Sequence, residues 1–340
     1  MAIPNQTLTT RFDTIMQEAE RRLSFEKWQG TVQDWQKQLR SELYDLLAVG
    51  YRPGAPQVEI LDTVDRGTYQ RQYVHMTSAD GVVIPAYQLV PTEMETPVGA
   101  VLCLHGHGPG KVIPAAAETD AKGRPVVVDG ERDFAVQAVK QGYIAIAPDH
   151  RGFGELQLDE DLEADTGNSC LQLSMRAIMA GKTVPGMRVH DCMCWMDYLR
   201  SLEQVDEDHI YITGQSGGGT VTLFSAAIDT RFAQAAPSCY FCTFAASILA
   251  MHHCSCNYAP GLLNLCEMYD IAGLVAPRPM LIIAGKEDPI FPIEGVYEAY
   301  EKLQDVYAAF GAQDNLELYV GPEGHRYYKA RVWDFFAQHA

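Results

Sequence analysis

The 340-residue sequence contains 47% hydrophobic residues and carries a formal net charge of −18 at pH 7. This length can bury a large core, and no apolar run approaches the roughly 18 residues that a membrane-spanning helix needs. The negative charge repels phosphate backbones and anionic lipid surfaces, so we expect neither nucleic acid nor a membrane as partner. One large domain with an appendage is favoured over two domains.

The N-terminus and the cysteines indicate the compartment. Met1–Thr10 lacks a basic region followed by an apolar core, so we expect no secretory signal unless one was trimmed. Nine cysteines in a chain that needs no covalent staples favour reduced thiols in a cytoplasmic protein. Short pairs occur at Cys192 and Cys194, Cys239 and Cys242, and Cys254 and Cys256, the last beside His252 and His253. Because CxxC spacing occurs only once, at Cys239–Cys242, we expect buried thiols and no metal.

Apolar residues recur at helical spacing from Thr7 to about Ala48, which predicts two amphipathic helices separated by Gly30. These helices pack either on the rest of the chain, the default, or on a second subunit, which would make a homo-oligomer. The Pro53–Pro56 cluster then marks a boundary. The sequence therefore predicts an N-terminal helical extension over residues 1–55 and a main domain over residues 56–340.

The main domain begins with short alternating runs that predict antiparallel edge strands. These runs are Val58–Val64, Tyr69–Met76 and Val82–Val90. Strands then alternate with helices, which predicts parallel βαβ units. The expected strands are Val98–Leu104, Tyr143–Ala147, Ile210–Thr213, Ala233–Ala236, Met280–Ala284 and Leu316–Val320. The expected helices are Asp133–Gln141, Gly186–Leu202, Gly218–Ile228, Ile293–Phe310 and Tyr327–His339.

Several of these strands are apolar on both faces, as in a sheet that helices cover on both sides. The predicted fold class is therefore α/β, with a mostly parallel central sheet and antiparallel N-terminal edge strands. Three connections are long for such a fold: residues 106–132, 152–185 and 238–269. Long loops at the carboxyl edge of the sheet typically shape a substrate pocket.

The segment Gly214–Gly219 reads GQSGGG between a predicted strand and a predicted helix. A strand, a sharp glycine-rich turn with a serine, and a helix together form a nucleophile elbow. The strained turn projects the serine hydroxyl above the sheet, and small neighbours let the backbone pass close by. Ser216 is therefore the candidate nucleophile.

A serine hydroxyl needs a base to take its proton, and a third group must orient that base. Asp288 follows the strand Met280–Ala284, and His325 follows the strand Leu316–Val320. The chain order serine, acid, histidine, each residue just past a strand end, matches the order in hydrolases with this elbow. Glu287 is the rival acid, but the Asp288-Pro289 junction fixes a turn, which favours Asp288.

A tetrahedral intermediate needs two hydrogen-bond donors for its oxyanion. The backbone N–H of Gly217 is one candidate, and that of His107, in the loop after the first parallel strand, is the other. The His107 side chain either faces the acyl pocket or makes a structural hydrogen bond. Tyr240 and Phe241 either line the substrate pocket or pack in the core.

The loop after the next strand contains Asp149 and Arg151. Isolated charges would be costly in this position, so we expect the two side chains to form a buried pair that braces the loop. Contact with the substrate is the alternative.

These residues resemble the α/β-hydrolase superfamily over about residues 69–340. Within the superfamily, the motif set looks like the dienelactone-hydrolase-like and acetyl xylan esterase-like branch. Bacterial acetyl xylan esterases are similar to this chain at Cys256–Leu263 (CNYAPGLL), Tyr269–Ala272 (YDIA) and Ala276–Pro279 (APRP). The resemblance implies a serine carboxylesterase that acts on short acyl esters, acetyl esters of carbohydrates among them. Its partner would be a small-molecule ester, and it would need no cofactor.

Two other functions remain open. The order of the candidate triad and the Asp149–Gly154 loop are also compatible with a peptidase of the prolyl oligopeptidase kind, although no propeller repeats precede the domain. The third reading is a non-catalytic, hydrolase-like binding protein.

Overall fold

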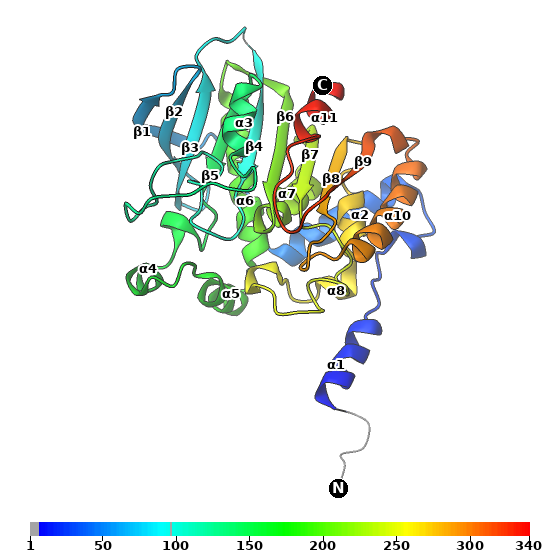
Figure 1. Cartoon of the computed structure of the whole chain (residues 1–340). Coiled ribbons are helices and arrows are strands. Elements are labelled where there is room, and N and C mark those ends of the chain that lie inside the picture. The colour runs from blue at the N-terminus through cyan, green and yellow to red at the C-terminus, as the bar shows by residue number, and fades with distance from the viewer. Residues whose placement is uncertain (1–6, 96) are drawn as a thin grey trace.

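The computed structural model describes residues 7–95 and 97–340, so residues 1–6 of the segment considered for a signal lie outside it. The described residues form a nine-stranded sheet with the order β1-β2-β3-β5-β4-β6-β7-β8-β9 (Figure 1). The strands are β1 Gln57–Asp65, β2 Tyr69–Thr77, β3 Val83–Pro91, β4 Val98–Leu104, β5 Ile144–Pro148, β6 Val205–Gln215, β7 Gln234–Ser238, β8 Met280–Gly285 and β9 Leu316–Gly321.

Strands β1, β2 and β3 pair antiparallel, and β3 joins β5 antiparallel; the pairs from β5 through β4 to β9 are parallel. The predicted α/β fold, with its antiparallel N-terminal edge, is therefore confirmed. In the β4–β6 register Leu104 is opposite Gly214. The strands β4 and β6 are parallel neighbours, and both residues lie at or near the carboxyl ends of their strands. The segments that carry His107 and Ser216 therefore start side by side at the carboxyl edge of the sheet.

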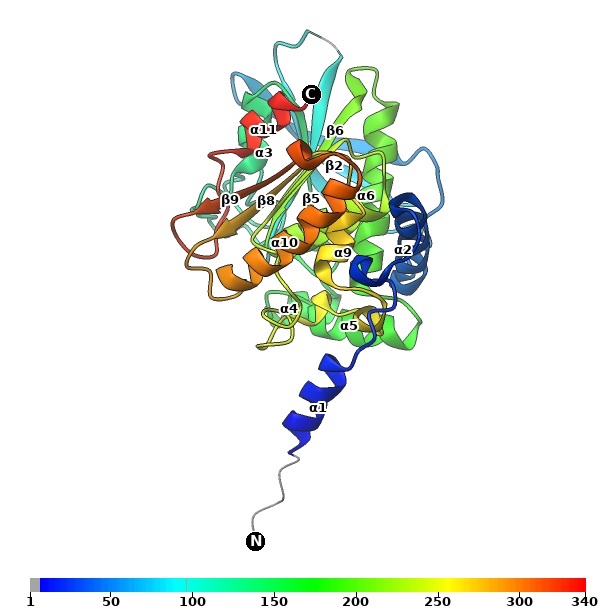
Figure 2. The ribbon, with the colours of Figure 1, turned by 90° about the vertical axis from the view of Figure 1, so that its right-hand side faces the viewer.

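Helices cover both faces of the sheet (Figures 1 and 2). They are α1 Leu8–Gln17, α2 Val32–Leu47, α3 Phe134–Lys140, α4 Asp159–Ala164, α5 Cys170–Met179, α6 Val184–Ser201, α7 Gly217–Ile228, α8 Leu262–Leu265, α9 Met268–Gly273, α10 Ile293–Ala309 and α11 Val332–Gln338. Short 3₁₀ turns lie at Phe25–Lys27, Gly154–Leu156, Ser255–Asn257 and Gln313–Asn315.

Successive residues of a strand point to opposite faces, and this alternation gives the molecule two cores. Leu102 and Leu104 of β4 belong to the larger core, which α2, α6, α7, α9 and α10 complete. Val101 and Cys103 belong to the smaller core, which α3 and α11 complete. No helix in the described ranges combines the length and apolarity that crossing a bilayer would require.

The N-terminal helices differ in how they pack. Helix α2 buries Trp35, Leu39 and Leu43 completely in the larger core, as expected for packing within the chain. Helix α1 projects away from the body in both views and exposes Leu8 and Phe12 (Figures 1 and 2). Packing of α1 on a second subunit and the boundary at residue 55 stay predictions.

The long connections contain short helices that the sequence analysis did not predict. Helices α4 and α5 lie in residues 152–185, and α8 with the start of α9 lies in residues 238–269. The last helix also differs, because α11 begins at Val332 rather than at Tyr327. Tyr327 instead lies buried in the smaller core, where its ring stacks on Phe134 and its hydroxyl lies 3.1 Å from that of Thr213.

Candidate active site

Ser216 occupies the turn between β6 and α7 with φ 56° and ψ −117°. A non-glycine residue rarely adopts a positive φ, so the turn is strained, as in a nucleophile elbow. A Cβ atom at Gly218 would lie 1.9 Å from the Leu104 carbonyl oxygen, and one at Gly214 would lie 2.6 Å from the same oxygen. The glycines of the motif therefore let this turn pass directly against β4.

The side chains of Asp288 and His325 meet in the loops after β8 and β9. His325 Nδ1 lies 2.7 Å from Asp288 Oδ2. Asp288 is buried, and its Oδ1 accepts hydrogen bonds from the backbone N–H groups of Ile290 (2.8 Å) and Phe291 (3.2 Å). A carboxylate only accepts hydrogen bonds, so Nδ1 of His325 carries the ring proton. The unprotonated Nε2 is then free to accept a hydrogen bond. Glu287, the rival acid, is exposed.

Ser216 and His325 open onto one cavity of about 350 Å³. Its walls are formed by His107, Arg132, Gln215, Ser216, Gly217, Tyr240, Met251, His252, His253, Cys254, Asn257, Ile290, Phe291 and His325. Phe241, named as a possible pocket residue, is absent from these walls, so of its two expected places the structure shows the core. Its side chain is buried in the larger core, whereas the neighbouring Tyr240 reaches the cavity.

Gly217 and His107 lie against each other beside Ser216. Gly217 is the first residue of α7, so its N–H is one of the free donors at a helix N-terminus. A Cβ atom at Gly217 would lie 3.0 Å from His107 Nδ1, so glycine leaves room for the imidazole ring. The ring also packs edge-on against Phe153, with centroids 5.0 Å apart.

A buried ion pair braces the loop that carries His107, but it differs from the predicted one. Asp149 Oδ2 lies 2.8 Å from Lys111 Nζ, and Asp149 Oδ1 accepts the Lys111 backbone N–H at 2.8 Å. Arg151 instead binds Asp191 and Asp80. The expected Asp149–Arg151 pair is therefore wrong, because each charge finds a partner in another segment.

His105 forms a second brace between the same two loops. Its Nδ1 donates to the Gly106 carbonyl at 2.7 Å, and its Nε2 accepts the His150 backbone N–H at 3.0 Å. Burial lowers the pKa of His105 to about 4, so the ring is neutral at pH 7 and can make both bonds. Hydrogen bonds between the loops that follow β4 and β5 thus fix the position of the His107 loop.

Several residues of the cavity walls were not predicted to line a pocket. Met251, His252, His253 and Asn257 come from the connection 238–269, and Arg132 comes from the connection 106–132. The length of those connections indicated a pocket, but no local pattern indicates which of their side chains face it. Asn257 is held in place by Thr220 of α7, whose hydroxyl donates to its side-chain oxygen at 3.0 Å.

Comparisons with known proteins agree with this geometry. A model of the Abhydrolase family, Abhydrolase_7, matches residues 13–307. "Putative hydrolase YtaP" of Bacillus subtilis (strain 168) is 29% identical over 249 residues, which cover 71% of this chain and 77% of that protein. "Carbohydrate esterase MZ0003", from an unknown prokaryotic organism, is 27% identical over 157 residues, which cover 41% of this chain and 36% of that protein.

Solved structures share the fold. A "putative acetyl xylan esterase" from Bacteroides fragilis has a TM-score of 0.78 at 19% identity, covering 93% of this chain and 83% of that one. A glucuronoyl esterase from Solibacter usitatus has a TM-score of 0.68 at 14% identity, covering 94% and 96%. The predicted α/β-hydrolase resemblance is confirmed, and with most of its length matched by the family model, this chain belongs to the Abhydrolase family.

Proposed function

We propose that this protein is a serine carboxylesterase that cleaves short-chain acyl esters, acetyl esters of carbohydrates in particular. One observation carries the proposal: a serine on a strained elbow shares a cavity with a histidine that is hydrogen-bonded to a buried aspartate. Ser216, His325 and Asp288 would then be nucleophile, base and orienting acid. This is the arrangement that acyl transfer to serine requires.

In the proposed reaction, Ser216 Oγ attacks the ester carbonyl while His325 Nε2 takes its proton. The backbone N–H groups of Gly217 and His107 would stabilise the tetrahedral oxyanion. His325 then gives the proton to the leaving alcohol, which departs and leaves an acyl-serine. Water, deprotonated by His325, attacks this ester and releases the acid. Asp288 holds the ring in the required tautomer throughout.

The cavity supports a small, polar substrate. Its volume of about 350 Å³ lies at the low end of ligand pockets, and its walls combine the aromatic Tyr240 and Phe291 with the polar Arg132, His252 and Asn257. Similar proteins are described as acetyl xylan, glucuronoyl and carbohydrate esterases. Acetylated sugars fit both observations.

The test is a substrate panel on the full chain: p-nitrophenyl acetate, longer p-nitrophenyl esters, acetylated xylo-oligosaccharides, methyl glucuronate and prolyl amides. We expect a burst of p-nitrophenol with the acetate ester, and turnover of acetylated sugars. Ser216→Ala should abolish both. Faster cleavage of prolyl amides than of acetyl esters would instead indicate a peptidase, and no turnover of any substrate would indicate a binding protein.

A further inference from the structure

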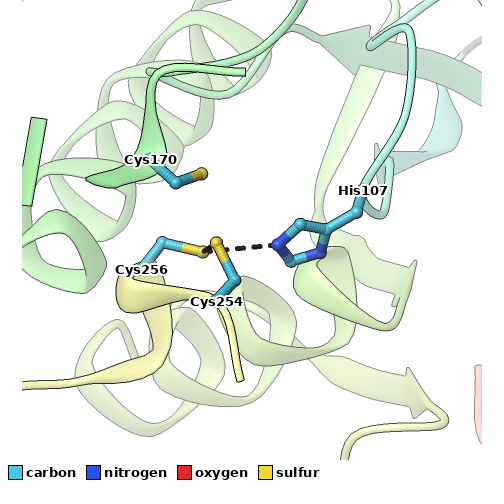
Figure 3. Close-up of side chains that lie close together, drawn as sticks. All are labelled: His107, Cys170, Cys254 and Cys256. Atoms are coloured by element: carbon cyan, nitrogen blue, oxygen red, sulfur yellow. Dashed lines mark hydrogen bonds between the residues drawn. The ribbon is translucent and has the colours of Figure 1, made fainter. Parts of the chain in front are cut away.

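Beside the proposed active site, three cysteines and a histidine gather around one point (Figure 3). Cys170 begins α5, Cys254 directly precedes the 3₁₀ turn Ser255–Asn257, Cys256 lies within that turn, and His107 comes from the loop after β4. The three sulfur atoms and one imidazole nitrogen all lie within 4.8 Å of one another. We expected no metal because cysteines close in sequence lack the spacing of a zinc site. This cluster combines residues from three segments that are distant in sequence, which that spacing cannot indicate.

The distances suit a tetrahedral metal ion. With Zn–S of about 2.3 Å and Zn–N of about 2.0 Å, tetrahedral geometry places two sulfurs about 3.8 Å apart and a sulfur and a nitrogen about 3.6 Å apart. Cys256 Sγ lies 3.6 Å from His107 Nε2 and 3.3 Å from Cys254 Sγ. A disulfide needs about 2.05 Å, so these two sulfurs are too far apart to be bonded.

A buried arginine beside the cluster supplies an independent observation. Arg188 of α6 is 1% exposed, and it donates to the Arg151 carbonyl oxygen at 2.8 Å and to Cys170 Sγ at 3.6 Å. Among the described residues, no carboxylate lies within ion-pair distance of it. A buried guanidinium without a counter-charge is costly, so the negative charge must reside on the neighbouring sulfurs.

We propose that Cys170, Cys254, Cys256 and His107 Nε2 bind one Zn²⁺ ion. All three sulfurs bind as thiolates, so binding releases to solvent whatever thiol protons remain, and the imidazole binds in its neutral form with its proton on Nδ1. Three thiolates and Zn²⁺ leave one net negative charge, which Arg188 balances. Cys₃His is a common ligand set of structural zinc sites, and its four ligands leave no open position for activating water.

Such an ion would hold residues of the proposed esterase site in place and would take no part in the reaction itself. It would fix the His107 ring against Gly217, and with it the backbone that carries the second proposed oxyanion donor. It would also tie the start of α5 and the Cys254–Cys256 turn to the cavity wall. We therefore expect metal loss to lower kcat and leave KM nearly unchanged, because the oxyanion donor acts mainly in the transition state.

The test measures metal on the full chain, purified in reducing buffer without chelator. We expect about one zinc ion per chain by elemental analysis. After exchange with Co²⁺ we expect the thiolate-to-cobalt absorption and the strong visible bands of a tetrahedral sulfur site. Cys254→Ala, which removes a partly exposed ligand, should lose both signals. Cys192→Ala is the matched control, since this buried cysteine of α6 lies outside the cluster and should retain them.

These readouts do not depend on esterase activity, so failure of the zinc site and failure of the proposed function can be told apart. Folded, fully reduced wild-type protein that takes up no more Zn²⁺ or Co²⁺ than Cys254→Ala would overturn the proposal. A disulfide among the three cysteines in freshly purified protein would also overturn it. If Cys254→Ala does not fold, the cobalt spectrum of the wild type decides alone. Stoichiometric zinc whose removal leaves kcat unchanged would contradict the positioning role.

Discussion

Two neighbouring side chains fix the orientation of His325, the proposed base. Asp288 fixes the ring through Nδ1, and Phe291 stacks on it with the ring planes 17° apart and the centroids 5.9 Å apart. Two backbone N–H groups hold the carboxylate in turn. Two residues of one turn, Asp288 and Phe291, therefore both contact the ring, which favours Asp288 over its exposed neighbour Glu287 as the acid of the proposed triad.

Asp288→Asn should lower kcat by about 10⁴-fold and leave the fold intact, because the amide NH₂ favours the wrong imidazole tautomer. The measurement is steady-state hydrolysis of p-nitrophenyl acetate, with circular dichroism to verify folding. Glu287→Gln is the matched control and should keep wild-type activity, since that side chain is exposed. Equal, small losses in the two variants would contradict the assignment of Asp288.

At the scale of elements, buried charges join the loops that follow β4 and β5. Lys111 is 2% exposed and contacts Asp149 and Glu155, while its ammonium also lies 5.5 Å from the centre of the Tyr73 ring. Asp149 additionally accepts the backbone N–H of Glu155 at 3.0 Å. These contacts hold the His107 loop in place against the loop that follows β5.

Lys111→Met should lower the free energy of unfolding by about 3–5 kcal/mol, because it leaves Asp149 buried without its cation. Urea denaturation of the two proteins gives the difference. The control is Lys122→Met, which removes a solvent-accessible pair with Asp165 and should cost only about 0–1 kcal/mol. Similar losses of unfolding free energy in the two variants would mean that burial of the Lys111–Asp149 pair does not affect stability.

Helix α6 carries a second charged contact, which predicts a pH dependence of stability. His190 Nδ1 lies 3.3 Å from Asp191 Oδ1, with Asp80 nearby and Arg151 bridging the two carboxylates. Burial lowers the pKa of His190, but the bond to Asp191 and the contact with Cys194 outweigh burial and raise it to about 9. The folded state thus binds this proton more tightly than the unfolded state.

The stability from His190 should be fully present below pH 6.5 and should be lost as the pH rises through about 9. Thermal unfolding across this range should show Tm falling with pH in the wild type. His190→Gln should remove the part of the slope that depends on this histidine. A wild-type slope that is unchanged in His190→Gln would contradict the assignment.

The elements also show what the sequence could predict. Every predicted strand is present because its residue pattern is strong, even in the largely exposed edge strand β1. The strand β6 starts earlier than expected, at Val205. Helices α4, α5 and α8 were missed because they are short and depend on tertiary contacts. Asp288 and His325 follow a motif with fixed chain order, so sequence was sufficient to pair them. The partner of Asp149 and the proposed metal ligands around Cys256 lie in segments distant in sequence, which no local pattern links.

At the scale of the whole molecule, α2 belongs to the larger core even though it precedes the predicted domain boundary. Trp35 is completely buried there, and its Nε1 donates to the Leu23 carbonyl at 2.8 Å. The family match, which begins at residue 13, also includes this helix. Helix α1, by contrast, exposes Leu8 and Phe12, which are 75% and 55% exposed.

Trp35→Ala should therefore destabilise the protein by about 3–5 kcal/mol, as expected for truncating a buried aromatic side chain. Deletion of residues 1–17, which removes α1, should leave the monomer's stability unchanged. Urea denaturation at low protein concentration measures both effects. If the N-terminal helices formed an independent extension, Trp35→Ala would not affect the main domain. The main domain of the variant would then unfold at the same urea concentration as that of the wild type.

Covalent labelling measures whether Ser216 is an activated nucleophile. A fluorophosphonate probe reacts with a serine only when a neighbouring base activates it. We predict one probe per chain, mapped to Ser216 by peptide mass spectrometry, with labelling lost in His325→Ala and retained in Glu287→Gln. Folded protein that remains unlabelled, or that is labelled at another serine, would contradict the account.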